Sequence, residues 1–153
     1  MPTVWRIVKE RYAAQAFDGE GARRFGGRWN SRGVPVVYAA CSRALAALEL
    51  LVHLERSAML SAYVLIGCDV DDALVDTLDP TTLPAHWGQS PATHELARMG
   101  DAWVRAGRSL ALAVPSALVP DEPIYLLNPK HTQFDAMRVG VPQRFDLDIR
   151  FVS

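Results

Sequence analysis

The sequence predicts an α+β fold with a compact, mixed, largely antiparallel sheet core and flanking helices. Apolar runs typical of strands outnumber helical segments and do not alternate regularly with them, as a parallel βαβ fold would require. The C-terminal residues alternate apolar and polar side chains, the period-two pattern of a half-exposed antiparallel strand. With 153 residues, 50% hydrophobic and 22% charged, the chain has the size and composition of one globular domain spanning residues 1–153.

In the first half of the chain we expect strands at Val4–Val8 and Val34–Ala40. Between them, Gly19–Gly33 is expected to be a loop, because it holds five glycines, which adopt turns that other residues resist. Ser42 is then the expected N-cap of an Ala- and Leu-rich helix running to about Arg56. These elements place a glycine-rich loop beside a short buried strand and a helix.

In the second half, the continuous apolar run Ala62–Val70 predicts a central strand. Asp71–Ser90 is expected to be a polar connection, because it carries two prolines and several aspartates. A second helix is predicted from near Pro91 through Trp103, with Ser90 as its cap.

Three more strands complete the predicted sheet. Leu110–Val114 and Ile124–Leu127 are short apolar runs that end in Pro-Ser and Asn-Pro. The C-terminal alternation predicts a last strand, whose apolar face holds Phe145, Leu147, Ile149 and Phe151.

Charge and cysteine content narrow the classes of function. The net charge of −1 argues against a general nucleic-acid coat or a membrane-surface binder. Cys41 and Cys68 stand alone, without the spacing of a disulfide framework or a zinc site. No apolar signal region or run of about 18 apolar residues is present, so we expect a cytoplasmic protein with no membrane contact.

The segment Gly19–Gly33 is the one locally basic stretch. Its four arginines against Glu20 give a local charge of +3, which suits a small polyanion. Arg28 stands between two glycines and Trp29, a poor arrangement for a freely moving surface residue. A solvated turn and an anion contact both remain open, and the constrained position of Arg28 favours the second.

The first helix carries Glu49 on the same stripe as His53 and Arg56. The stripe is either the water-facing side of the helix or the wall of a pocket in which apolar neighbours tune the carboxylate. The residues alone do not separate the two.

Ser116 follows a predicted strand but lacks the G-x-S-x-G surroundings of a hydrolytic nucleophile. It is either a ligand-binding serine at a strand end or a turn-forming serine. Tyr38 is most simply a core aromatic residue with a satisfied hydroxyl. The four histidines show no metal-ligand spacing, so no metal site is expected.

Taken together and in order, these motifs resemble the RES domain family, the toxin components of bacterial RES–Xre toxin–antitoxin pairs. The resemblance is carried by GGRWN at Gly26–Asn30, Tyr38 before an Ala/Leu/Glu helix, VPS at Val114–Ser116 and LLNPKHTQF at Leu126–Phe134. One departure is Thr132, where the family more often has proline.

The resemblance implies an ADP-ribosyltransferase-like fold and an activity on NAD⁺. Members of the family deplete NAD⁺ by hydrolysis or phosphorolysis, or transfer ADP-ribose to a protein. Arg28, Glu49 and Ser116 match the arginine, glutamate and serine that name the family and are the implied catalytic residues. Arg28, Tyr38, Ser116 and Asn128 are the implied binding residues, whereas Arg6 is a weaker match that would shape the site.

The resemblance also implies partners. NAD⁺ would be the substrate, with no further cofactor, and a cognate Xre-type helix-turn-helix antitoxin would block the pocket. No direct DNA binding is expected, and a homo-oligomer remains open. Two other readings are a protein mono-ADP-ribosyltransferase toxin and a non-catalytic nucleotide- or RNA-binding module built on the arginines beside Phe25 and Trp29.

Overall fold

The longest strand pair joins β1 (Thr3–Lys9) to β3 (Tyr63–Asp69), which align antiparallel over seven residue pairs. The computed structural model describes residues 1–54, 61–148 and 150. Within these residues one eight-stranded sheet has the order β4-β5-β6-β2-β1-β3-β7, and β8 also pairs with β3. The other strands are β2 (Val37–Ala40), β4 (Val75–Thr77), β5 (Ala111–Pro115), β6 (Pro123–Leu127), β7 (Arg138–Val139) and β8 (Gln143–Phe145).

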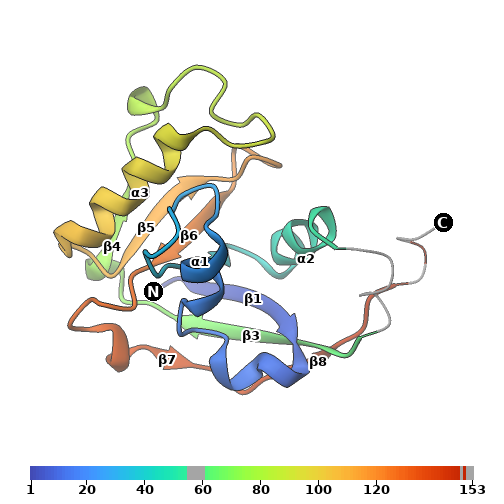
Figure 1. Cartoon of the computed structure of the whole chain (residues 1–153). Coiled ribbons are helices and arrows are strands. Elements are labelled where there is room, and N and C mark those ends of the chain that lie inside the picture. The colour runs from blue at the N-terminus through green and yellow to red at the C-terminus, as the bar shows by residue number, and fades with distance from the viewer. Residues whose placement is uncertain (55–60, 149, 151–153) are drawn as a thin grey trace.

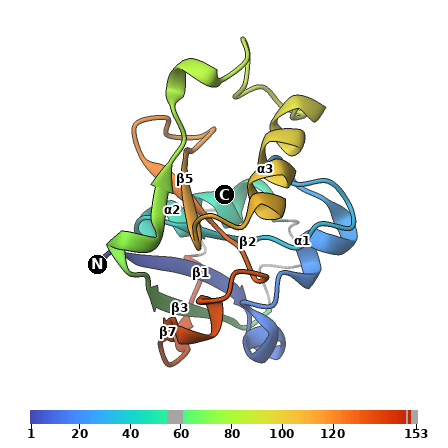
Figure 2. The ribbon, with the colours of Figure 1, turned by 90° about the vertical axis from the view of Figure 1, so that its left-hand side faces the viewer.

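The sheet is antiparallel except where β4 pairs in parallel with β5. It is strongly curled: Figure 2 shows β5 nearly upright while β1 and β3 lie across the view. The helices are α1 (Glu20–Phe25), α2 (Arg43–Val52) and α3 (His94–Ala106). Figure 1 shows α3 along β5 and β6, and α2 close to β1. The α+β class predicted from the sequence is therefore confirmed.

Alternate residues of the strands face two apolar clusters on opposite sides of the sheet. Tyr38 and Ala40 of β2 face the larger cluster, to which both α2 and α3 contribute buried side chains. Val37 and Ala39 face the smaller cluster, which is covered by irregular segments rather than by long helices. The side of the sheet with α2 and α3 is the one that carries most of the predicted site residues.

The N-terminus of α2 is where the sequence places it. The Ser42 hydroxyl accepts the backbone N–H of Leu45 at 3.1 Å, so the predicted N-cap is confirmed. The helix ends at Val52, and the predicted end near Arg56 lies outside the described residues.

The prediction of a plain loop over Gly19–Gly33 was wrong, because α1 forms inside it. The Asp18 carboxylate accepts the N–H of Glu20 at the start of this helix, and Glu20 pairs with Arg23 at 2.8 Å. Gly26, at a φ of 74°, then ends it. The glycines thus do not prevent a short helix: Gly19 and Gly26 flank it and Gly21 lies within it.

The second helix starts at His94 rather than near Pro91, and the side chain of the preceding Thr93 makes no capping hydrogen bond. Its buried stripe begins at Leu96, and Ser90 and Pro91 are exposed, so tertiary packing supports helix only from His94 onward. The Asp71–Ser90 connection also contains β4, which the polar composition did not indicate.

The predicted C-terminal strand is shorter and earlier than expected. Phe145 pairs with Tyr63, the first residue of β3, so a strand beyond Phe145 has no partner there. Leu147 therefore lies outside any strand, and Ile149 and Phe151 fall outside the described residues. No helix in the described parts of the chain is long and apolar enough to cross a membrane.

Candidate active site

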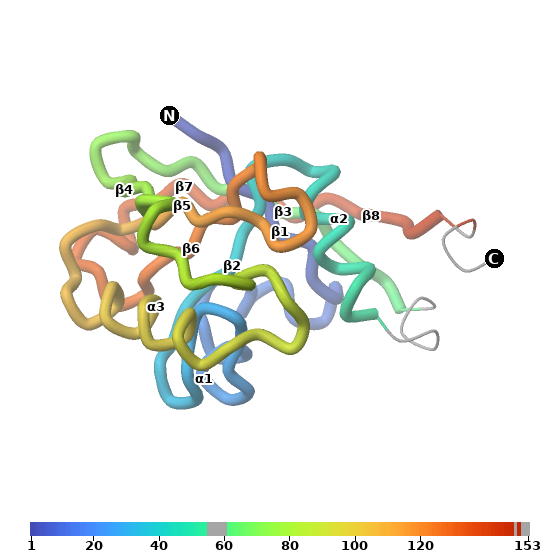
Figure 3. Tube along the Cα trace, turned by 90° about the horizontal axis from the view of Figure 1, so that it is seen from above, coloured from blue at the N-terminus to red at the C-terminus, as the bar shows by residue number. Residues whose placement is uncertain are grey.

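Ser116 and Glu49, 67 residues apart in sequence, meet directly. The Ser116 hydroxyl donates to Oε1 of Glu49 at 2.9 Å, from the end of β5 to the middle of α2. Its oxygen also accepts the N–H groups of Leu118 and Val119, at 3.1 and 3.2 Å. Figure 3 shows the β5–β6 turn lying beside α2. Ser116 is fully buried and Glu49 is half-buried, so the serine fixes the carboxylate instead of contacting solvent.

These contacts decide between the readings that the sequence left open. The Glu49 position is not simply the water-facing side of α2, because Ser116 holds its carboxylate, whereas His53 is exposed. Ser116 is a turn-forming serine, as the plainer reading had it, and it is also a partner of Glu49. Oε2 of Glu49 has no hydrogen-bond partner among the described residues and is free to face a ligand.

Arg28 lies at the tip of a tight turn in which Gly27 and Asn30 form an isolated β-bridge. One of its terminal nitrogens, Nη1, donates to the carbonyl oxygens of Trp87 and Gln89, at 3.1 and 2.8 Å. A guanidinium has five N–H donors, so Nη2 and Nε keep three for an anion. The reading of Arg28 as a freely solvated surface residue is wrong, since Arg28 is half-buried and held by two carbonyls.

Tyr38 joins the same turn from β2. Its hydroxyl accepts the N–H of Trp29 at 3.0 Å and donates to the side-chain oxygen of Asn30. Burial, with a smaller contribution from the Asp101 carboxylate, raises the pKa of Tyr38 well above its ordinary value. The hydroxyl therefore stays protonated and keeps donating.

The turn leaves no room for a side chain at Gly27. A Cβ placed there would lie 2.7 Å from the Tyr38 hydroxyl oxygen and 2.9 Å from Oδ1 of Asn30. Because both neighbours are fixed by hydrogen bonds, this position requires glycine.

Arg6 lies on the face of the sheet opposite to α2 and α3. Its guanidinium donates through Nη1 to the backbone carbonyl of Tyr38, while its Nε is buried without a hydrogen-bond partner among the described residues. Burial lowers the pKa of Arg6 to about 10, and the Asp18 carboxylate opposes that shift. Arg6 thus supports the β2 backbone behind Tyr38 and does not reach the side that carries Glu49.

Asn128 lies near Tyr38 but far from Ser116, because it follows β6 two residues after Leu126, the cross-strand partner of Tyr38. Its backbone N–H bonds to Leu110 whereas that of Ser116 bonds to Glu122, so the two lie at opposite ends of the β5–β6 hairpin, about 20 Å apart. The Asn128 amide donates to the carbonyl of Val104 at 3.1 Å, and its oxygen accepts from Lys130 at 3.0 Å. Asn128 thus ties α3 to the hairpin, and its implied binding role stays a prediction.

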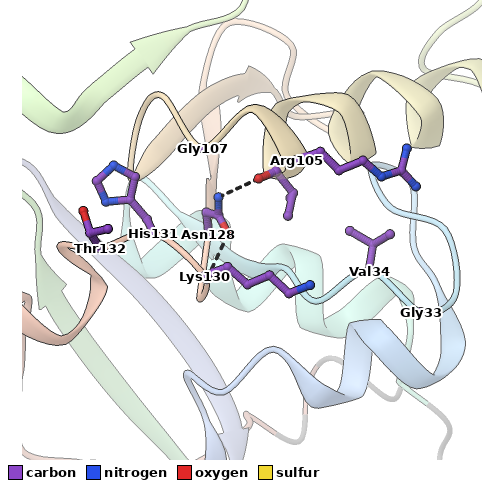
Figure 4. Close-up of a pocket in the computed structure, with 9 residues that line it drawn as sticks. Gly33, Val34, Arg105, Gly107, Asn128, Lys130, His131 and Thr132 are labelled. Carbon is purple, nitrogen blue, oxygen red and sulfur yellow. Dashed lines mark hydrogen bonds between the residues drawn. The ribbon is translucent and has the colours of Figure 1, made fainter.

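A cavity of about 550 Å³ adjoins Asn128 at the end of α3. Figure 4 shows Arg105 and Lys130 extending along it toward Gly33 and Val34, with the two hydrogen bonds of Asn128 at its back. Neither Arg28, Tyr38, Glu49 nor Ser116 lines this cavity.

The two halves of the site share one apolar cluster. Trp29 and Tyr38 of the Arg28 turn, Leu50 beside Glu49 and Val119 beyond Ser116 all pack into it, as does Trp87. Residues adjacent to Arg28, Glu49 and Ser116 therefore share one side of the sheet with Tyr38, and this side carries a fixed guanidinium and a held carboxylate.

Sequence reasoning missed two contributors. Asp101 is 4% exposed and its Oδ1 accepts the N–H of Ser31 at 2.9 Å. The sequence did contain a sign of this role, because Asp101 is an acidic residue within the apolar stripe formed by Leu96, Ala97, Gly100 and Val104. The carbonyls of Trp87 and Gln89 are backbone groups of an irregular segment and give no sequence signal.

Comparisons with known proteins agree with this picture. The RES domain family model matches residues 3–148. A protein named Toxin Res from Yersinia enterocolitica is 40% identical over 148 residues, covering 96% of this chain and 97% of its own. A Sphingobium protein named Prs ADP-ribosylating toxin is 36% identical over 153 residues, covering 97% and 95%.

A solved structure, the toxin–antitoxin complex MbcT–MbcA of M. tuberculosis, contains a chain with the same fold. The TM-score is 0.77 at 22% identity, over 95% of this chain and 84% of that one. The order of motifs, the sheet that unites them and the match over nearly the whole length lead to one conclusion: the chain belongs to the RES domain family.

Proposed function

We propose that the chain is the toxin of a bacterial toxin–antitoxin pair and that it consumes NAD⁺ by cleaving the bond between nicotinamide and ribose. The observation that carries the proposal is the Ser116–Glu49 hydrogen bond, which fixes a half-buried carboxylate on the side of the sheet where Arg28 is held. Relatives named as toxins support the toxin role.

Arg28 would hold the diphosphate of the dinucleotide. The carbonyls of Trp87 and Gln89 occupy Nη1 only, so Nη2 and Nε can donate paired, charge-assisted hydrogen bonds to phosphate oxygens. A guanidinium held from behind loses little freedom when it binds. The Tyr38 hydroxyl keeps the turn in place and does not take part in bond cleavage.

Glu49 would stabilise the reacting sugar. When the bond from the ribose anomeric carbon to nicotinamide breaks, its electron pair leaves with nicotinamide, and positive charge develops as in glycoside cleavage. A preorganised carboxylate lowers the energy of that state, and losing such a group costs roughly 3–4 kcal/mol, a hundredfold or more in rate. An oxygen of water or of inorganic phosphate then bonds to the anomeric carbon and its proton is released to solvent, which gives hydrolysis or phosphorolysis.

A second candidate is transfer of ADP-ribose to a protein. It is favoured by one observation, the name of the Sphingobium relative as an ADP-ribosylating toxin. The roles of Arg28 and Glu49 would be the same, and only the acceptor would differ. The reading as an RNA-binding module is weakened by the rest of the chain, because the net charge of −1 leaves no extended basic surface beyond the arginine segment.

An antitoxin of the Xre type would hold the toxin inactive by covering this side of the sheet. The M. tuberculosis neighbour was solved in complex with an antitoxin, which supports a protein partner of this kind. Co-expression of the gene next to that of the toxin is the direct way to find it.

The test is release of free nicotinamide from NAD⁺, with and without phosphate, by protein made in a cell-free system. We expect release by the wild type and a loss of about a hundredfold or more in Arg28→Ala and Glu49→Gln. Arg24→Ala is the matched control, because Arg24 is an exposed arginine of the same segment that contacts Phe25. ADP-ribose, its 1″-phosphate or a modified protein identifies the acceptor, and a folded wild type as inert as Arg28→Ala would refute the proposal.

A further inference from the structure

Helix α3 contacts the Arg28 turn through two consecutive residues. Oδ1 of Asp101 accepts the N–H of Ser31 at 2.9 Å. At Gly100, an added Cβ would lie only 1.7 Å from the carbonyl oxygen of Trp29, so the helix backbone rests directly on the turn. The helix therefore supports the turn directly.

Asp101 is an unusual residue for its position. It lies on the buried face of α3, is 4% exposed, and makes no ion pair with any residue in the described ranges. Burying a carboxylate without a cation is unfavourable, and an apolar side chain would suit the stripe better. Among the described residues, the hydrogen bond from Ser31 is the only one that the Asp101 carboxylate accepts.

We propose that Asp101 is a positioning residue for Arg28, because it fixes the Gly27–Ser31 turn from the α3 side and so sets where the guanidinium is presented. Three sets of hydrogen bonds then fix the turn. Tyr38 accepts the N–H of Trp29, and the Asn30 side chain donates to the carbonyls of Ala22 and Val34. Asp101 accepts the N–H of Ser31. Only the identity of the bound ligand rests on the proposed function; the positioning itself does not.

The Asp101 carboxylate is also among the charges that act on Tyr38: burial is the main cause that raises the pKa of this phenol, and Asp101 adds to it.

The kinetic test compares Asp101→Ala with Asp101→Asn, whose amide oxygen can still accept from Ser31. We expect Asp101→Ala to raise the KM for NAD⁺ about tenfold with a smaller change in kcat, and Asp101→Asn to stay within about threefold of wild type. The control Ser109→Ala removes a buried hydrogen bond to Trp103 of the same helix without touching the turn, so it lowers stability but leaves KM unchanged. Equal KM values for Asp101→Ala and Ser109→Ala would overturn the inference.

A second measurement does not depend on NAD⁺ consumption. The heteronuclear NOE of the Arg28 Nε–H group reports its order, assigned by comparison with Arg28→Lys. We expect an ordered group in the wild type and in Asp101→Asn, and a mobile one in Asp101→Ala. If Arg28 stays ordered in Asp101→Ala, the positioning role is wrong. If instead the wild type releases no nicotinamide while the NOE changes as expected, the proposed function fails and the positioning role stands.

Discussion

Every hydrogen-bonding capacity of the Ser116 hydroxyl is used. Its proton goes to Glu49, and its oxygen accepts two backbone N–H groups of the following turn. Ser116 therefore couples the β5–β6 turn to the carboxylate of α2. A serine in this state is a poor nucleophile, in line with the missing nucleophile motif, and a good means of fixing a neighbour.

Replacing Ser116 by alanine should lower both stability and activity. The N–H groups of Leu118 and Val119 would lose their partner, at a cost of about 1–3 kcal/mol, and Glu49 would lose the donor that orients it. We expect nicotinamide release to fall about tenfold. Ser109→Ala, the removal of another buried serine hydroxyl, should lower stability to a similar extent at full activity. Equal activities of the two variants would show that Ser116 serves the fold alone.

At the scale of elements, α3 is the helix that makes the site rigid. One face of this helix packs into the core through Leu96 and Val104, and Gly100 lets its backbone touch the Arg28 turn. At its other end the carbonyl of Val104 is held by Asn128. The helix thus connects the turn at Arg28 to the far end of the β5–β6 hairpin.

Two glycine-to-alanine substitutions in helices should have opposite effects. Alanine favours a helix by about 1 kcal/mol over glycine, so Gly21→Ala in α1, where an added Cβ meets nothing within 4 Å, should be neutral or stabilising. Gly100→Ala should destabilise by about 2 kcal/mol or more, because its Cβ would collide with the Trp29 carbonyl. Denaturant unfolding measures both. A neutral Gly100→Ala would mean that α3 does not lie against the turn.

At the scale of the molecule, one sheet carries both halves of the site. The β5–β6 hairpin carries Ser116, whereas β1 and β2 pack against α2, which carries Glu49. All four strands belong to the same hydrogen-bonded sheet. Because the larger apolar cluster runs continuously from Ile7 of β1 to Leu112 of β5, the two halves should not separate. The assignment of residues 1–153 to one domain remains a prediction.

Unfolding should accordingly be a single cooperative transition. Trp5, whose ring lies against Gly67 of β3, reports one part of the sheet, and Trp103 of α3 reports the other. In variants that keep only one of the four tryptophans, either Trp5 or Trp103, the fluorescence midpoints should coincide with each other and with far-UV circular dichroism. Separate midpoints would indicate two units that unfold independently.

Local patterns predicted much of the fold. The strands at β1, β3, β5 and β6 and the Ser42 cap follow from apolar runs and capping chemistry, which act over a few residues. The errors fall where the end of an element depends on the segment that it packs against. Strand β8 stops because its partner β3 begins at Tyr63, and α3 starts where its apolar stripe can be buried. Such limits depend on segments far away in the chain.

For the site, the sequence by itself determined the residue types and their order: arginine in a glycine turn, tyrosine in a strand, glutamate on a helix and serine after a strand. Tertiary structure alone decided that Ser116 holds Glu49, that Asp101 holds the turn, and that Asn128 holds the end of α3. Periodicity reports which face of an element is buried, but it carries no information on which side chain lies opposite. Those pairings arise only when the sheet brings together residues up to 70 positions apart.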